Sequence, residues 1–270
     1  MYSGTTIRTK SGRIMGAHQR IDRIARRYIN SISDNKYFPS ISEILHFEGK
    51  HGPDGIKRKS PGVDEPWHFI EPKEASLHHP LIKIIEDHII NLRQALINNN
   101  NERSAFEAAW LAHVITDGLT PAHHHAYEDE LASLRKGEHH STRNTKLQKV
   151  LMPGDNVPEL IRNNWKYWGS KGLMTMHLGF ELGVAAAITP YNTLDIPSPT
   201  DDELSLARED RYNQLFIDSL IKINSIQMYK AYELKGWSRQ LARQTRNELV
   251  PEIVKAVVLA WYTALHGVDR

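Results

Sequence analysis

Apolar residues recur at intervals of three and four along nearly the whole chain, and this spacing is the feature that most constrains the fold. Ile21, Ile24 and Ala25 form such a stripe within a segment from about 17 to 29. The alternation of apolar and polar residues that indicates half-buried strands is found nowhere in the sequence. No repeat or Gly/Ser-rich linker divides the chain. We therefore expect a single all-α domain spanning residues 1–270.

The same periodicity places the other helices, and proline and glycine separate them. Between residues 31 and 76, frequent prolines and glycines exclude any long element, so a long loop-rich segment should follow the first helix. Further helices are expected at about 76–97, 102–116, 121–134, 160–188 (interrupted at Gly169 and Gly172), 202–234, and from 238 to 265 with a kink at Pro251.

Composition narrows the possible functions. The formal net charge of +2 argues against a surface built throughout for polyanions, although it permits a local basic groove. The absence of cysteine excludes disulfides, thiolate metal sites and cysteine nucleophiles. No apolar run follows the cations near the start, and no stretch approaches the roughly 20 apolar residues that span a bilayer. We expect a soluble protein without a transmembrane segment and, as given, a cytoplasmic location.

Histidine is the unusual residue, with 15 in the chain and twelve between His46 and His140. It is the commonest metal ligand in proteins and titrates near neutral pH. For most of these histidines an ordinary surface position is the simplest interpretation. Those that occur at regular spacing among apolar residues need a different explanation.

The segment from Ala109 to His125 combines an apolar helix pattern with metal-binding residue types. His113 and Asp117 are four residues apart, so they project from the same face of the expected helix. Their neighbours are mostly apolar, and a buried aspartate is costly unless it is paired or bound to a metal. A turn after this helix can bring His123 back beside the pair. The structural alternative is a buried His–Asp hydrogen bond with His123 at the surface.

A second pair with the same spacing lies between Leu173 and Ala186, where His177 and Glu181 share a helix face among apolar neighbours. A buried ionised glutamate needs a cation, and no Lys or Arg follows nearby in this segment after Lys171. One such pair could be structural. Two pairs in a helical chain without cysteine favour metal ions bound by nitrogen and oxygen.

Two further histidines stand in suggestive surroundings. His68 lies in the loop-rich segment within the sequence Trp-His-Phe-Ile-Glu-Pro, and His18 lies at the start of the first helix. A packed core residue is the alternative for His68, and a histidine without function at a helix N-terminus is the alternative for His18.

Taken together, these four segments resemble the zinc-dependent phospholipase C superfamily, which includes the fungal single-strand-specific nucleases. The shared order is an early helix with a histidine, then His-Phe-x-acid-Pro, then His-x3-Asp-x5-His with proline two residues before the last histidine, then His-x3-Glu. The match runs from His18 to Glu181, about 60% of the chain. The resemblance implies a multi-helix all-α domain of the phospholipase C type.

The family holds three zinc ions in a cleft, and its ligand positions carry over to this chain. The first zinc ion would be bound by His68, His113 and Asp117. An acid from the loop before His68 completes that site in the family, and Asp54 stands at a suitable spacing. Asp64 competes with Asp54, which could instead be an ordinary turn residue, and Asp54 is the favoured choice. In the family this acid also orients or deprotonates the attacking water, which makes Asp54 the expected catalytic residue.

The resemblance likewise implies the ligands of the other two zinc ions. The second would be held by His123, His177 and Glu181. The third would be held by His18 and the other oxygen of Asp117, so that Asp117 bridges two metals.

The chain departs from the family at its first residue. In the family an N-terminal tryptophan, released by processing, binds the third zinc ion through its amino group and carbonyl. Residue 1 is Met here, and the bulky Tyr2 should leave it in place. The amine of Met1 could substitute as a ligand, or the third metal could be weak or absent.

The function implied by the resemblance is hydrolysis of phosphoric esters, in which a two- or three-zinc cluster activates water for attack on phosphorus. The substrate could be a phospholipid, a nucleotide or a single-stranded nucleic acid, and the sequence does not settle which or the oligomeric state. The basic run at 57–59 and Trp67 could serve a nuclease. A lipase would need an apolar approach to a lipid surface, which the sequence does not show clearly. Two rivals are a non-catalytic metal-binding helical protein and a di-iron carboxylate bundle, but the latter requires Glu-x-x-His pairs.

Overall fold

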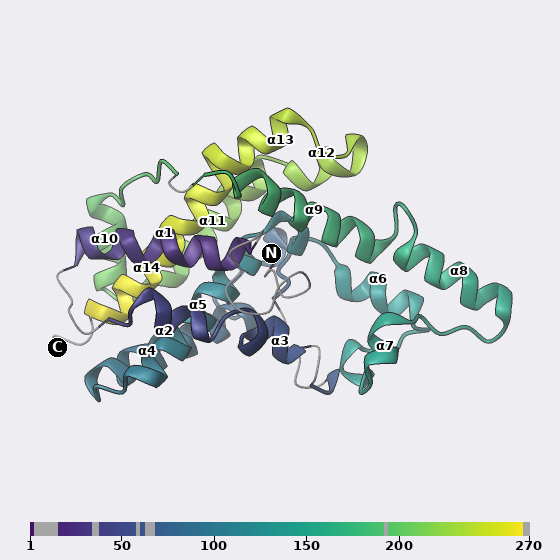
Figure 1. The fold of residues 1–270 in the computed structure, drawn as a ribbon, viewed down its shortest axis with the longest axis horizontal. Coiled ribbons are helices and arrows are strands. Elements are labelled where there is room, and N and C mark those ends of the chain that lie inside the picture. The colour runs from purple at the N-terminus through teal and green to yellow at the C-terminus, as the bar shows by residue number, and fades with distance from the viewer. Residues whose placement is uncertain (3–15, 34–37, 58–59, 63–67, 192–193, 267–270) are drawn as a thin grey trace.

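The expected all-α fold is confirmed, since the structure contains helices and no β-strand within the residues it describes (Figure 1). This computed structural model describes residues 1–2, 16–33, 38–57, 60–62, 68–191 and 194–266. The helices are α1 (Ala17–Ile32), α2 (Ile41–His46), α3 (Pro53–Lys57), α4 (Pro80–Ile97), α5 (Asn101–Gly118), α6 (Tyr127–Leu134), α7 (Lys146–Val150), α8 (Val157–Trp168), α9 (Leu173–Ile188), α10 (Asp201–Arg208), α11 (Tyr212–Ser225), α12 (Met228–Lys235), α13 (Arg239–Gln244) and α14 (Val250–His266). Short 3-10 turns lie at η1 (Gly49–His51), η3 (Pro72–Glu74), η4 (Pro121–His123) and η5 (His140–Thr142).

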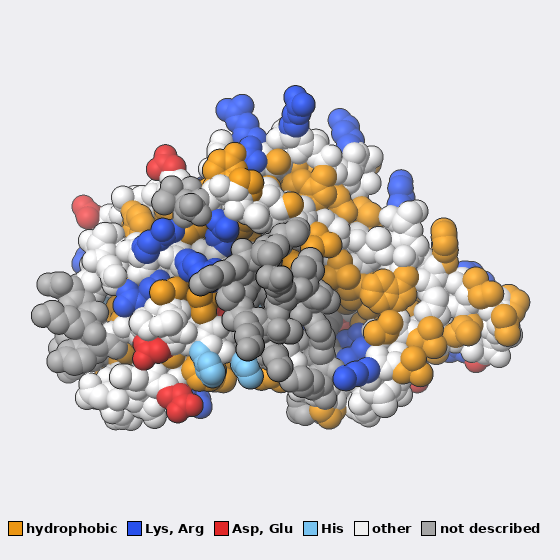
Figure 2. All heavy atoms as spheres, in the orientation of Figure 1, with side chains coloured by type: hydrophobic (Ala, Val, Ile, Leu, Met, Phe, Trp, Pro, Cys, Tyr) orange, Lys and Arg blue, Asp and Glu red, His pale blue; other side chains and the backbone are white. Residues whose placement is uncertain are grey.

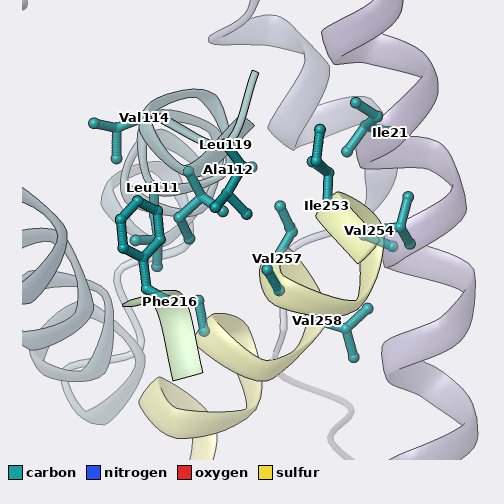
Figure 3. Close-up of a cluster of buried hydrophobic side chains, with 14 of the residues drawn as sticks. Ile21, Leu111, Ala112, Val114, Leu119, Phe216, Ile253, Val254, Val257 and Val258 are labelled. Atoms are coloured by element: carbon teal, nitrogen blue, oxygen red, sulfur yellow. The ribbon is translucent and has the colours of Figure 1, made fainter. Parts of the chain in front are cut away.

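Helix α14 forms the centre of the main core. Its side chains are buried on nearly every face, and it packs between α1 on one side and α5 on the other. Figure 3 shows Val257 and Val258 between Ile21 of α1 and Leu111 of α5. The stretch 239–266 is apolar and long enough to cross a membrane, but 89% of its most apolar window is buried within the protein. Its hydrophobicity is thus explained by its position in the core.

Helix α5 crosses this core and ends where the candidate site begins. At Gly118 a Cβ atom would lie 2.7 Å from the Leu81 side chain and 3.0 Å from that of Phe216. Glycine therefore lets the end of α5 approach α4 and α11 this closely, whereas a larger residue would require these side chains to shift. The approach fixes the position of Asp117 and of the η4 turn that follows.

A second, smaller core lies under an arm formed by α6, α7 and α8, which projects at the right of Figure 1. The residues that build it are Phe69, Tyr127, Leu131, Leu134, Met152 and Tyr167. Phe69 belongs to the segment of His68, and Tyr127 begins α6. The arm is therefore attached to the segments that carry the candidate metal ligands.

Three expected helices differ in the structure. The helix expected at 121–134 is divided into η4 and α6, because the chain leaves helical geometry at 124–126. The helix expected at 202–234 is three helices, separated at Asp210 and Gln227, which have the positive backbone angles φ 60 and φ 56. Before Pro251 the chain forms a π-helical turn, η6 (Thr245–Leu249), which accommodates a residue without a backbone N–H.

Candidate metal centre

Asp117 is the central residue of the candidate site. It lies in the last turn of α5, where it is 3% exposed. Its Oδ2 atom is 2.9 Å from Nδ1 of His68 and 3.2 Å from Nε2 of His113, one turn earlier on α5. Its Oδ1 atom is 3.2 Å from Nε2 of His18. One carboxylate therefore meets histidines from three segments that are far apart in the sequence.

The amino end of Met1 occupies the same place. Its amino group contacts Oδ1 of Asp117 and lies 3.1 Å from Oε1 of Glu181. Its carbonyl oxygen lies 2.7 Å from Nε2 of His18. The carbonyl of Tyr2 accepts a hydrogen bond from the backbone N–H of Ala17 at 2.9 Å, which anchors this end against the start of α1. The amine and carbonyl of residue 1 thus lie against Asp117, Glu181 and His18.

His123, His177 and Glu181 form the adjoining part of the site. Oε1 of Glu181 is 3.0 Å from Nε2 of His177, because these two residues are one turn apart on α9. The η4 turn brings His123 to the same atom, with its Nε2 also at 3.0 Å. The ring of Phe69 stacks on His123 with centroids 4.6 Å apart. The backbone N–H of Ile70 donates a hydrogen bond to the His123 carbonyl at 3.1 Å. The loop segment after His68 therefore positions the η4 turn directly.

Asp54, the expected catalytic acid, lies at the edge of the cluster in the first turn of α3. Its Oδ1 atom is 3.9 Å from Nε2 of His113, and its side chain is 31% exposed, unlike those of the other cluster residues. Burial opposes ionisation, but the nearby His113 holds the pKa of Asp54 below its ordinary value. The competing Asp64, like Trp67 and residues 58–59 of the basic run, lies outside the described residues.

The histidines that the resemblance leaves out are turned to other partners. His124 donates from Nε2 to the carbonyl oxygen of Gly118 at 2.9 Å. The ring of His125 stacks on Tyr229 with centroids 5.3 Å apart. Neither belongs to the two buried groups whose donor atoms lie within 4.8 Å of one another, which are His18, His113, Asp117 and His123, His177, Glu181. The register across Pro121 thus separates His123 from its neighbours.

The two carboxylates are held in their ionised forms. Burial raises the pKa of a carboxyl, but the Met1 amine and the histidines His18 and His113 keep the pKa of Asp117 well below its ordinary value. The Met1 amine and His177 do the same for Glu181 against the same opposing burial. In return, although burial lowers it, the two carboxylates raise the pKa of the Met1 amine to about 10. Opposite charges with little access to water thus hold the cluster together.

Two buried acids behind His113 were not expected from the sequence. Glu48, 4% exposed, places Oε1 3.3 Å and Oε2 3.4 Å from Nδ1 of His113, on the side of the ring away from Asp117. Burial and the charge of Glu48 together raise the pKa of the buried Asp22 well above its ordinary value. A ring that donates from Nδ1 to a carboxylate presents Nε2 as a metal donor. Glu48 lies in a loop with no periodic pattern, so its sequence gave no signal of this contact.

The turn that carries Glu48 depends on a glycine. A Cβ atom at Gly52 would lie 2.7 Å from the Phe47 carbonyl oxygen and 2.9 Å from the Glu48 Cα atom. The backbone N–H of Gly52 also donates to the carbonyl of Gly49 at 3.3 Å. The close turn brings Glu48 under His113 while Asp54 follows on α3.

A third group of possible donors lies apart from the centre, on the arm. Glu128 of α6 lies 2.8 Å from Nδ1 of His140 and also contacts His139. The His139 side chain is exposed, so this group resembles a solvated surface ion pair more than a built metal site.

No protein-family model, curated protein or solved structure matches the chain. The chemistry of the centre must therefore be judged from its own residues and geometry.

Proposed function

We propose that this chain is a metal-dependent phosphoester hydrolase of the zinc-dependent phospholipase C type. The observation that carries the proposal is the convergence on Asp117 and Glu181 of five histidines and the amino end of Met1, all nearly inaccessible to water. Burial of two ionised carboxylates so close together costs free energy of folding unless cations accompany them. A metal cluster supplies those cations.

The donor set fits zinc. The donors are imidazole nitrogens, carboxylate oxygens, one amine and one carbonyl, which are borderline and hard ligands of the kinds that zinc accepts. Nε2 of His113 is buried and finds no hydrogen-bond partner among the described residues, although it points toward Asp117. A metal ion is the natural partner for a nitrogen so placed.

We assign the residues to three ligand sets, as the resemblance implies. His68, His113 and Asp117, with Asp54, would hold the first zinc ion. His123, His177 and Glu181 would hold the second. The third would use His18, Asp117 and the amine and carbonyl of Met1. The contacts of the Met1 amine with both Asp117 and Glu181 support its assignment to a ligand set that adjoins the other two.

The remaining residues would position the reacting groups. When bound, zinc ions supply a Lewis acid for phosphoryl oxygens and lower the pKa of water toward neutrality. Asp54 is ionised and partly exposed, so its carboxylate can accept a hydrogen bond from the attacking water and orient it. Glu48 fixes the orientation of the His113 ring from behind.

The decisive experiment is elemental analysis of untagged protein, followed by assays against phosphodiesters and phosphomonoesters. We expect about two to three zinc ions per chain, lost to a strong chelator together with activity and restored by zinc. Iron in place of zinc, or no metal at all, would contradict the proposal. A full zinc complement without hydrolysis of any substrate would instead favour a metal-binding protein that is not an enzyme.

A second candidate, a single-strand nuclease, is favoured by a basic groove on α1. Arg20, Arg23, Arg26 and Arg27 line a cavity of about 730 Å³ beside Ser40. Arg26 donates to the carbonyl oxygens of Pro39 at 2.5 Å and Phe38 at 3.1 Å, neutral partners that fix the guanidinium while it keeps its charge. Such a groove suits a chain of phosphates. The test is hydrolysis of a single-stranded oligonucleotide by the original protein and by Arg23→Gln/Arg27→Gln. If the variant loses this activity but still cleaves small phosphodiesters, the result would favour the nuclease.

A further inference from the structure

Helix α3, which carries Asp54, is too short to be stable by itself. It has five residues, and isolated helices of fewer than about 12 residues are marginal in water. Asp54 lies in its first turn, and Lys57 is its last residue. Any shift of this helix would move Asp54 relative to Nε2 of His113, which is 3.9 Å from its Oδ1 atom. The position of the expected catalytic acid therefore depends on what holds α3 in place.

The end of α3 lacks a backbone partner for a reason that the sequence supplies. The carbonyl of Lys57 would accept a helical hydrogen bond from the N–H of the residue four positions later, but that residue is Pro61, which has no N–H. The turn before it is still closed, because the N–H of Ser60 donates to the Ile56 carbonyl at 2.9 Å. The Lys57 carbonyl is thus left to a side chain or to water.

Lys149 of the arm supplies the missing donor. Its ammonium group donates to the carbonyl oxygen of Lys57 and, at 2.6 Å, to that of Ser60, which lie 92 and 89 residues away in the sequence. A cation at this end of a helix is also favourable because the last carbonyls carry partial negative charge. Figure 1 shows residues 60–62 beside α7, and Figure 2 shows Lys and Arg side chains where this part of the arm adjoins the rest of the molecule.

Helix α7 presents Lys149 from a fixed position. The first turn of α7 is closed by a capping box between Thr145 and Gln148. Its last turn is held by the indole N–H of Trp168, which donates to the Val150 carbonyl at 2.6 Å. Lys149 lies between these two attachments and is half-buried. Its side chain therefore extends from an element that is held at both ends.

A second contact seats the segment after α3 on the arm. A Cβ atom at Gly62 would lie 2.5 Å from the carbonyl oxygen of His140 and 2.9 Å from the carbonyl carbon of Ser141, both of which belong to η5. Backbone meets backbone there, so the segment 60–62 lies directly against the arm. The contacts of Lys149 are therefore part of an interface between the arm and the segment that follows Asp54.

We propose that Lys149 is a positioning residue for Asp54, which it holds in place through the last turn of α3. This inference rests on the proposed function, in which Asp54 orients the attacking water. Lys149 acts on the backbone of residues 57 and 60 and not on the reacting atoms. Because Asp54 is only about 4.5 Å from Lys57 along the helix axis, fixing one end of α3 also fixes the other. The arm thereby contributes to catalysis without supplying a metal ligand.

The test compares Lys149→Met, which removes the donors and keeps a long apolar side chain, with Lys149→Arg, which keeps the charge and the donors. Lys146→Met is the matched control, because Lys146 lies on the same helix and is exposed. In zinc-saturated protein acting on a soluble phosphodiester, we expect Lys149→Met to lower kcat by about 10- to 100-fold with KM nearly unchanged. Lys149→Arg should restore most of kcat, and the control should match the original protein.

Hydrogen exchange supplies a second measurement that needs neither zinc nor substrate. The N–H groups of Ile56 and Ser60, which close the turns of α3, should exchange faster in Lys149→Met than in the original protein or the control. If none of the proteins hydrolysed a phosphoester, the proposed function would be refuted, while faster exchange would still support the hold of Lys149 on α3. Unchanged exchange at both groups, or an unchanged kcat in an active enzyme, would overturn the positioning role. So would a fall in kcat that merely follows the fraction of unfolded protein, as measured by urea unfolding.

Discussion

Replacement of Asp117 by asparagine is the sharpest test of the proposed centre. The substitution keeps the size of the side chain and removes its charge. In the structure, Oδ1 contacts the Met1 amine and His18, and Oδ2 contacts His68 and His113. An amide presents one oxygen and one NH₂ group, so it cannot accept from both sides as the carboxylate does.

The expected cost can be worked out from burial. Asp117 and the Met1 amine are both nearly inaccessible to water, and removal of one partner of a buried ion pair typically costs about 3–5 kcal/mol. The metal-free variant should therefore lose about that much free energy of unfolding. The zinc-loaded protein should lose more, because two of the three proposed ligand sets share Asp117.

Two measurements are needed, with one control. Elemental analysis after dialysis gives the zinc content, and urea unfolding in chelator gives the stability of the metal-free protein. His124→Ala is the matched control, because His124 bonds to the Gly118 carbonyl and lies outside both buried groups. If His124→Ala lost zinc as severely as Asp117→Asn, the register across Pro121 would be wrong. A full zinc complement in Asp117→Asn would refute the bridging role.

Three further outcomes are expected. Glu48→Gln should weaken zinc binding by about 10- to 100-fold, because the amide no longer fixes the His113 ring as an anion does. Competition with a chelating dye measures the affinity, and an unchanged value would contradict this role of Glu48. A residue fused before Met1 should lower the zinc content by about one ion per chain and reduce turnover more than substrate binding. A C-terminal tag should change neither quantity. Equal zinc content and equal turnover in the two tagged proteins would show that the Met1 amine is not a ligand. Burial lowers the pKa of His68 to about 4 and that of His123 to about 3, from an ordinary value of 6.5. In chelator, as the pH falls below 6.5, these histidines are therefore protonated in the unfolded chain before they are protonated in the folded protein. Urea unfolding at pH 6 and pH 5 should therefore show a loss of about 1.4 kcal/mol per pH unit for each imidazole, and an equal free energy at both values would be inconsistent with their burial.

The fold was predictable where helices are regular. The stripes of α1 and α4 follow directly from the spacing of their apolar residues, and the structure confirms both helices. The breaks at Asp210 and Gln227 were missed because a non-glycine residue with positive φ has no reliable sequence signal. Such conformations are decided by the packing of the flanking helices, which the local sequence does not encode.

The candidate site divides in the same way. The pairs His113–Asp117 and His177–Glu181 are set by the helical repeat, so their shared faces could be predicted from spacing alone. The contact of Glu48 with His113 joins segments 65 residues apart and depends on a loop, where no periodicity operates. The role of each residue as a metal ligand remains a prediction, although the structure brings them together.

Helix α8 shows a further limit of periodicity. The apolar spacing of α8 correctly predicts a helix, but the same spacing would result whether its apolar face met the core or the solvent. Only the structure shows that Tyr167 faces the second core while Trp165 does not. An exposed stripe and a core-facing stripe become distinguishable once the remaining helices are placed.

The charges of the centre argue against a purely structural role. Asp117, Glu181 and Glu48 are all buried, and burial favours neutral groups in each case. Hydrogen bonds to histidine could be made by asparagine or glutamine at a lower desolvation cost. In the metal-free protein, the groups that offset these carboxylates are the Met1 amine and His113, whose pKa is raised well above its ordinary value by Glu48 and Asp117 although burial lowers it. Both would release a proton on binding zinc, and two of the carboxylates that hold these protons, Asp117 and Glu181, are proposed ligands of the metal. This excess of buried carboxylates is the reason for which we propose that the centre binds cations.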